Sequence, residues 1–275
     1  MMPQVARIDT LRSEPGSQLT ARPDELCVEE PLEIRIAGEP LAITMRTPGH
    51  DHELVAGFLL AEGLIRTRAD LGSLVHCGHL GAEGFGNVID ALPAPGTVLD
   101  IEALGRTRRG TLTTASCGMC GRTMISDLLA RLAPAPPCAP FPRSFIASLA
   151  TALRTQQPGF ERTGGLHAAG IARPDQALLT VREDVGRHNA VDKVIGRQLL
   201  DGLVPAHGAL LVVSGRTSFE IVQKALAAGL AGVIGISAPS SLAVSTAARF
   251  GLLLCGFARS TTFNIYAGAH HLERD

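Results

Sequence analysis

Two closely spaced cysteines, Cys117 and Cys120, are the residues of this sequence best suited to covalent chemistry. They lie directly before a helix predicted over Thr123–Leu132, and the free N–H groups and partial positive charge of a helix N-terminus stabilise a thiolate. Four arginines surround the pair in sequence and would add to that effect: Arg106, Arg108, Arg109 and Arg122. A thiolate on a basic loop is a nucleophile suited to passing a sulfur atom between two partners.

The same pair fits other kinds of site. It could be half of a zinc site, with further ligands from His76, Cys77 and His79. A thioredoxin-like motif fits less well, because that motif follows the first strand of a βαβ unit, whereas a long basic loop precedes this pair. A zinc deaminase would need His-x-Glu upstream and a proline before the first cysteine. Here His52 directly precedes Glu53, and a serine precedes the pair.

Hydroxyl-rich loops follow three apolar strands predicted in the second half of the chain. Ligands of parallel sheets bind beyond the carboxyl ends of the strands, and two of these loops precede helices, whose first N–H groups can hold a phosphate. The loops are Ser214–Ser218, Ser237–Ser241 and Phe257–Thr262, and the candidate ligand-binding residues on the first two are Ser214, Arg216 and Ser237. The pattern favours a nucleotide or pyrophosphate site, although the chain has no Walker motif or Gly-x-Gly-x-x-Gly. The alternative is that these hydroxyl groups only cap helices.

Charged groups and an imidazole are concentrated in Glu183–Lys193, between a predicted strand and a predicted helix. His188 and Asp192 are four residues apart and therefore share one helix face, where an acid–imidazole pair could act in catalysis or hold a ligand. The segment could equally be a solvated helix start capped by Asp184. His167 lies in a second Gly-flanked segment expected near the same sheet edge, so both histidines are candidate lining residues.

The elements that must position these groups divide at a proline-rich stretch, residues 133–142, which has five prolines in ten residues. This division predicts a smaller N-terminal α+β domain over residues 1–135 and a second domain over residues 136–275. The first domain is predicted to contain a loose polar segment over residues 1–24, a hairpin over Glu33–Arg46, a helix over His52–Ile65, and short strands at Leu74–Cys77, Asn87–Leu92 and Thr97–Ile101.

The second domain alternates helices and strands in the order α-β-β-α-β-α-β-α-β. Its apolar strands predict a parallel sheet covered by helices on both faces. The predicted helices are Ser144–Gln156, Arg187–Leu200, Phe219–Ala228 and Leu242–Phe250, and the predicted strands are His167–Ala172, Ala177–Arg182, Ala209–Val213, Gly232–Ile236 and Leu252–Gly256.

Composition excludes several functional classes. The 25 basic and 26 acidic residues give a net charge of −1, which argues against binding bulk nucleic acid. The longest apolar-rich run, Ala225–Ser237, falls short of the roughly 20 residues of a membrane helix, and no secretory signal is recognised, so a cytoplasmic protein is expected. Six cysteines in 275 residues are too few for a disulfide-built fold. Four of them are expected to be small buried hydrophobic residues: Cys27, Cys77, Cys138 and Cys255.

Taken together, these segments resemble the formate dehydrogenase accessory sulfurtransferase family (FdhD). The matching stretches are Gly57–Ile65, Cys117–Gly121, Thr163–Ala169, Glu183–His188 with Asp192 and Lys193, Ser214–Lys224, and Ser237–Val244. The resemblance implies a sulfurtransferase that accepts sulfane sulfur from a cysteine desulfurase. It would pass this sulfur to the molybdenum cofactor, a bis(molybdopterin guanine dinucleotide), before the cofactor enters formate dehydrogenase.

The resemblance also implies roles for particular residues. Cys117 would form the persulfide, with Cys120 as its partner, and the protein itself would ligate no metal. The cofactor-binding stretch of the family would fall on Phe257, Ala258, Arg259, Ser260, Thr261 and Thr262. The second domain would be similar to cytidine deaminases, a mixed sheet with helices on both faces. A homodimer is compatible with the sequence, and the rival function is a zinc-binding or nucleotide-binding interaction module without sulfur transfer.

Overall fold

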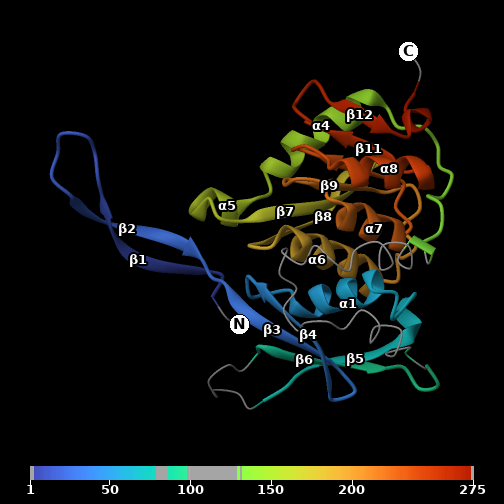
Figure 1. Ribbon diagram of the computed structural model, residues 1–275, viewed down its shortest axis with the longest axis horizontal. Coiled ribbons are helices and arrows are strands. Elements are labelled where there is room, and N and C mark those ends of the chain that lie inside the picture. The colour runs from blue at the N-terminus through green and yellow to red at the C-terminus, as the bar shows by residue number, and fades with distance from the viewer. Residues whose placement is uncertain (1–2, 79–85, 98, 100–128, 131, 274–275) are drawn as a thin grey trace.

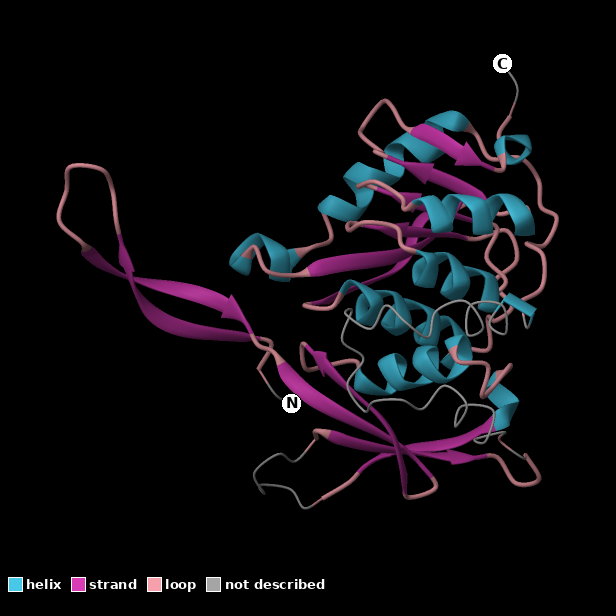
Figure 2. Ribbon diagram, viewed as in Figure 1, coloured by secondary structure: helices cyan, strands magenta, loops and turns pink. Residues whose placement is uncertain are grey.

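The computed structural model describes residues 3–78, 86–97, 99, 129–130 and 132–273 of the chain (Figure 1). These residues form a two-stranded arm, a four-stranded sheet and a six-stranded sheet, with helices between the two larger sheets and beyond them (Figure 2). The Cys-x-x-Cys pair, the four arginines around it and His79 lie outside the described residues. The predicted helix over 123–132 and strand over 97–101 also fall mostly outside them.

The N-terminal segment is an antiparallel arm that projects from the rest of the molecule (Figure 1). It consists of β1 (Val5–Arg12) and β2 (Thr20–Cys27), so the prediction of a loose segment over residues 1–24 was wrong. These strands show no alternating pattern in the sequence because the arm buries almost nothing, and its large apolar residues stay exposed. At the base of the arm, the guanidinium of Arg162 donates two hydrogen bonds to the Glu25 carboxylate, at 2.8 and 3.0 Å.

The four-stranded sheet has the order β4-β3-β6-β5. Its strands are β3 (Glu30–Ile36), β4 (Glu39–Arg46), β5 (Leu71–His76) and β6 (Val88–Pro93). The predicted hairpin over residues 33–46 is confirmed as β3 and β4. Alternation along β3 turns Leu32, Ile34 and Ile36 inward, where they share one apolar cluster with helix α1 (Asp51–Ala61).

The six-stranded sheet is mixed, with the order β12-β11-β10-β9-β7-β8. Only β9 (Leu210–Val213), β10 (Gly232–Gly235) and β11 (Leu253–Gly256) run parallel to one another. The hairpin of β7 (His167–Arg173) and β8 (Gln176–Asp184) joins β9 in the antiparallel sense, and so does β12 (Asn264–Ala267) with β11. The expectation of a parallel sheet therefore holds only for its centre, and the chain has the mixed α/β fold.

Helices cover both faces of this sheet because its strands are apolar on both sides. Along β9, Leu210 and Val212 pack with α4 (Arg143–Arg154), whereas Leu211 and Val213 face the opposite layer. That layer consists of α6 (Arg187–Leu200), α7 (Phe219–Ala227) and α8 (Ser241–Phe250). The predicted helix over 187–200 is confirmed at both ends. The short helix α5 (Pro158–Thr163) was not predicted.

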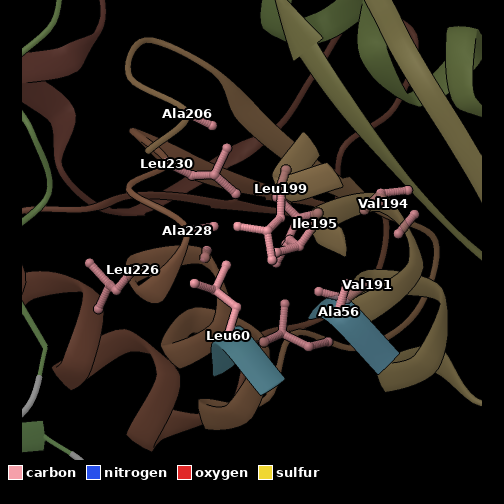
Figure 3. Close-up of a cluster of buried hydrophobic side chains, with 14 of the residues drawn as sticks. Ala56, Leu60, Val191, Val194, Ile195, Leu199, Ala206, Leu226, Ala228 and Leu230 are labelled. Carbon is pink, nitrogen blue, oxygen red and sulfur yellow. The ribbon is translucent and has the colours of Figure 1, made fainter. Parts of the chain in front are cut away.

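Helices α1 and α6 join the two sheets by an unusually close crossing. A Cβ atom on Gly57 would lie 2.0 Å from the carbonyl oxygen of Asp192, and one on Gly196 would lie 1.8 Å from that of Glu53. Glycine is required at both positions because the obstacle is backbone. Figure 3 shows the apolar contact beside this crossing, where Ala56 and Leu60 of α1 lie near apolar side chains of α6. One core thus contains residues from both sides of the boundary at 135/136, and the division into two domains stays a prediction.

Candidate functional site

The carboxyl ends of β9, β10 and β11 bring the three hydroxyl-rich loops to one edge of the sheet. Backbone hydrogen bonds tie the loops together. The N–H of Ile236 donates to the carbonyl of Val213 (2.9 Å), and that of Phe257 donates to the carbonyl of Ser237 (3.2 Å). Because β7 is antiparallel to β9, His167 begins its strand at the same edge, and Asp184 ends β8 there. The predicted juxtaposition of the three loops with His167 and His188 is therefore present.

Ser214 fixes His167 beside the first loop. Its hydroxyl oxygen accepts the N–H of Ala168 (2.9 Å), and its own N–H donates to the Ala168 carbonyl (2.9 Å). Gly215 then passes close to the side chains of His167 and Arg187, since a Cβ there would lie 3.3 Å from His167 Nδ1 and 3.5 Å from Arg187 Cδ. The loop backbone, an imidazole and a guanidinium thus line one small region.

Positive charge dominates the surroundings of His167. Burial lowers the pKa of this imidazole, and the neighbouring Arg187, His188 and Arg216 lower it further, while Asp184 opposes them. Arg216 is exposed on the first loop. Because the imidazole is neutral, the positive charge of the guanidinium groups around it favours a bound anion, which can also accept their hydrogen bonds.

His188 is held by Glu220 rather than by the residue one helical turn away. Its Nε2 lies 2.8 Å from a carboxylate oxygen of Glu220 and 3.1 Å from the hydroxyl of Ser218. The acid–imidazole pair predicted for His188 and Asp192 was therefore wrong, because the Asp192 carboxylate lies 2.6 Å from the ammonium group of Lys224. The hydrogen bond from His188 lowers the pKa of Glu220. Glu220 was not recognised in the sequence as a residue of this site.

The two loops that precede helices differ in how their serines are used. In the second loop, Ser240 caps α8, with its hydroxyl accepting the N–H of Ala243 (3.2 Å). In the first loop, Ser218 precedes α7 but its side chain makes no capping hydrogen bond. Helix capping therefore explains Ser240 and leaves the N-terminus of α7 without a side-chain cap.

The third loop is held against its neighbours by its own backbone and by Arg259. Ala258 is fully buried and its N–H donates to the Gly235 carbonyl (3.0 Å). The Arg259 guanidinium donates to the carbonyls of Ile236 (2.7 Å) and Ala258 (2.8 Å). Phe257 has a positive φ of 51° and stays 43% exposed. Three further residues of the loop present exposed hydroxyl groups: Ser260, Thr261 and Thr262.

Two buried polar atoms at this edge have no hydrogen-bond partner among the described residues. They are Nε of Arg187 and the hydroxyl oxygen of Thr217. Buried polar atoms are nearly always paired with protein, water or ligand. Arg187 was missed as a site residue although it directly precedes His188, because its neighbour offered the more obvious chemistry. Its place as the first residue of α6, at a strand-to-helix junction, was the available signal.

The rest of the Glu183–Lys193 segment builds the scaffold. Lys193 Nζ lies 2.6 Å from Asp184 Oδ2 and donates to the carbonyl of Thr47 (2.9 Å), so this fully buried pair binds α6 to the end of β4. Burial raises the pKa of both Asp184 and Asp192, and the neighbouring ammonium groups oppose that rise. Lys193 and Lys224 are the only lysines in the sequence.

The zinc alternative finds little support in the described part of the chain. No group of three or more His, Cys, Asp or Glu side chains there could hold a metal ion. The rings of His52 and His76 lie 5.0 Å apart, and burial lowers the pKa of His52. His79 and the Cys-x-x-Cys pair are not among the described residues. Within the same ranges, no helix is long and apolar enough to cross a membrane.

The chain is similar to known proteins along most of its length. The model of the FdhD/NarQ family matches residues 27–273. A sulfur carrier protein FdhD from Anaeromyxobacter dehalogenans is 51% identical over 90% of this chain and 88% of its own, and one from Nocardia farcinica is 47% identical over 98% and 95%.

A solved structure shares the fold at low sequence identity. It is a crystal structure from Desulfotalea psychrophila, assigned as a formate dehydrogenase accessory protein. It matches with a TM-score of 0.77 at 22% identity, over 98% of this chain and 100% of that one. The family model and the close relatives together settle the classification: the chain belongs to the FdhD/NarQ family.

Proposed function

We propose that this protein is a sulfur carrier and acts as a sulfurtransferase. It accepts sulfane sulfur from a cysteine desulfurase as a persulfide on Cys117. It then transfers the sulfur to a bis(molybdopterin guanine dinucleotide) molybdenum cofactor destined for formate dehydrogenase. Membership of the family and the sulfur carrier names of the relatives support the proposal. The cofactor is a substrate here, not a resident group.

The observation that carries the binding half of the proposal is the unpartnered Nε of Arg187 beside a neutral His167. A guanine dinucleotide brings a pyrophosphate, whose oxygens are strong acceptors for guanidinium groups and for N–H groups at a helix N-terminus. The edge supplies both, from Arg187, Arg216 and the uncapped first turn of α7. These residues therefore fit the anionic part of the substrate.

Other residues of the edge would shape the site around that anion. Glu220 holds His188 in one orientation, and Ser214 holds His167 against the first loop. The exposed ring of Phe257 and the hydroxyl groups of Ser260, Thr261 and Thr262 would line the part of the site beyond Ser237. Ala258 and Arg259 would act through the shape of the loop, since Ala258 is buried and Arg259 bonds to backbone carbonyls.

The sulfur step is a thiol–persulfide exchange. The Cys117 thiolate bonds to the outer sulfur of the donor persulfide, the sulfur–sulfur bond of the donor breaks, and the donor leaves as a thiolate. Cys120 is the partner cysteine, which would take up or release that sulfur. The transfer moves one sulfur atom without net oxidation or reduction of the two proteins.

Mass spectrometry of the Cys117 peptide tests the sulfur step directly. Incubation with a cysteine desulfurase and cysteine is expected to add one sulfur atom to this peptide. The substitution Cys117→Ala is expected to abolish sulfur transfer while leaving nucleotide binding unchanged, and Cys27→Ala is the matched control. Stoichiometric zinc in the purified protein, or full support of formate dehydrogenase activity by the Cys117→Ala variant, would contradict the proposal.

The proposal has three further parts. It assigns the protein to the cytoplasm, where thiols stay reduced. It assigns the six-stranded sheet to the cytidine-deaminase-like arrangement, with the metal signature of those enzymes absent from the sequence. It allows a homodimer, which light scattering of the purified chain would detect.

A further inference from the structure

A second thiol, outside the Cys-x-x-Cys pair, lies against an imidazole. Sγ of Cys138 is 3.5 Å from Nδ1 of His271, although the two residues are 133 positions apart in the chain. Two other described thiols donate to backbone carbonyls instead, Cys27 to Gly165 and Cys77 to Val75. Cys138 is therefore more than the small hydrophobic residue that the sequence suggested.

The hydrogen bonds of the ring decide which nitrogen can act as a base. His271 Nε2 lies 2.8 Å from the carbonyl oxygen of Gly251. A carbonyl oxygen can only accept, so Nε2 must carry the proton of the neutral ring and Nδ1 must present its lone pair. That lone pair faces the thiol of Cys138. A nucleophile, a base within reach and a third group that orients the base form the usual arrangement of an activated thiol.

The backbone around the pair holds this geometry. The Phe141 N–H donates to the His271 carbonyl (2.7 Å), and the Glu273 N–H donates to the Phe141 carbonyl (3.1 Å). The proline-rich stretch and the C-terminal segment are thus joined through Phe141, three residues after Cys138. His271 is buried and Cys138 is half-buried, so the base is shielded while the cysteine residue stays partly accessible. Burial also raises the pKa of Cys138, which keeps the resting group a thiol.

We propose that Cys138 and His271 form a second sulfur-accepting site, which takes sulfane sulfur from low-molecular-weight persulfides. The choice of persulfide as the substrate class rests on the proposed function, whereas the activation of Cys138 does not. Sγ of Cys138 bonds to the outer sulfur of R–S–SH, and the bond between that sulfur and the R–S group breaks. His271 Nδ1 takes the thiol proton and returns it to the leaving R–S group. One sulfur atom changes place, and nothing is oxidised or reduced.

The test uses the full-length chain carrying Cys117→Ser and Cys120→Ser, so that sulfur cannot arrive through those two cysteines. This protein is incubated with glutathione persulfide and alkylated at intervals, and the peptides of Cys138 and Cys27 are followed by mass spectrometry. Cys138 is expected to gain sulfur at least ~10-fold faster than Cys27, and His271→Gln is expected to slow the gain at Cys138 by about 100-fold, the typical contribution of a general base.

Glutamine is chosen because its amide can still donate to the Gly251 carbonyl but cannot take the thiol proton. Unchanged labelling of Cys27 and of buried Cys255 shows that the His271→Gln variant is folded. Equal rates at Cys138 in the two proteins would overturn the proposal. If the His271→Gln variant does not fold, the rates of sulfur gain at Cys138 and Cys27 are compared in the chain that carries only Cys117→Ser and Cys120→Ser. Equal rates at these two cysteines would also overturn the proposal. Desulfurase-dependent labelling of Cys117 in a Cys138→Ser chain reports on the proposed function separately.

Discussion

Two polar regions of this molecule use charged and polar side chains in opposite ways. Between α6 and its neighbours, buried aspartates and lysines stand in pairs, each 2.6 Å apart. At the edge of the six-stranded sheet, Nε of Arg187 and the hydroxyl of Thr217 are buried without a partner among the described residues, and Arg216 is exposed. We call the first region the buried pairs; it consists of the pair of Asp184 with Lys193 and the pair of Asp192 with Lys224. The difference teaches that whether a buried polar group has a partner within the protein distinguishes scaffold from candidate site.

One short segment supplies both regions. Arg187 and His188 form the first turn of α6 and face the sheet edge, whereas Asp192 and Lys193 lie in the next turns and are buried. Within about six residues, the same charged segment therefore supplies side chains to the sheet edge and to the buried pairs. In a chain with 25 basic residues, its only two lysines are both in the buried pairs. The sheet edge instead uses the guanidinium groups of Arg187 and Arg216, a type of group that binds phosphate well.

The largest expected effect is that of Lys193→Met, which keeps the length of the side chain and removes its charge. Asp184 would then be buried without its cation, and breaking a buried pair costs about 3–5 kcal/mol of unfolding free energy. Denaturant unfolding followed by circular dichroism measures this loss. With the ammonium gone, burial alone keeps the pKa of Asp184 raised, so unfolding releases a proton. The variant should therefore lose further stability as the pH rises above the ordinary aspartate value of 3.8.

The matched control for this variant is Arg197→Met on the same helix. Arg197 forms an exposed pair with Asp201, at 2.7 Å, and exposed pairs contribute less than about 1 kcal/mol. A loss in Lys193→Met no larger than the loss in Arg197→Met would mean that burial does not distinguish the two kinds of pair.

The next effect in size is that of Gly196→Ala at the crossing of α1 and α6. The new Cβ would lie 1.8 Å from the carbonyl oxygen of Glu53, and backbone cannot rotate away as a side chain can. Overpacking typically costs about 1–3 kcal/mol, and we expect the upper part of that range. Thermal unfolding measures the loss. Nucleotide binding by the folded variant should be retained, and wild-type stability would show that the two helices can separate without cost.

The sequence predicted local structure well and partners poorly. Helix α6, the hairpin of β3 and β4, and the meeting of three loops at one edge followed from apolar periodicity and turn residues. The arm of β1 and β2 did not, because its strands bury too little to show a pattern. The pairing of Asp192 with Lys224, 32 residues away, also could not be foreseen, since helical spacing favoured His188. The same holds for the pair of His188 with Glu220, which depends on how α6 and α7 pack.

A smaller and more selective effect is expected for Arg187→Ala. If its guanidinium binds the pyrophosphate of the substrate, the loss of one charged hydrogen bond costs about 1.5–3 kcal/mol, which weakens binding by roughly 10–100-fold. Isothermal titration calorimetry with GDP as the probe measures the change. Arg154→Ala on α4, whose guanidinium lies over the ring of Phe160, is the matched control and should bind GDP normally. Unchanged GDP binding by the Arg187→Ala variant would remove this residue from the site.

The smallest expected effect is a shift in the pKa of His167. This imidazole lies at the sheet edge, and its pKa responds both to the arginines there and to Asp184 of the buried pairs. Burial lowers the pKa of this imidazole below its ordinary value of 6.5, and the nearby Arg187 and Arg216 lower it further, so the folded protein favours the neutral ring. The stability that comes from keeping His167 neutral is complete above pH 6.5. It is lost as the pH falls toward the lowered pKa of the folded protein, because the unfolded chain binds the proton at a higher pH than the folded chain does. Arg187→Ala removes the nearest cationic influence and should raise the pKa of His167, although burial keeps it below 6.5. Bound GDP should raise it too, since an anion favours the imidazolium. Proton NMR of the ring measures both shifts, and a pKa that falls on GDP binding would place the anion elsewhere.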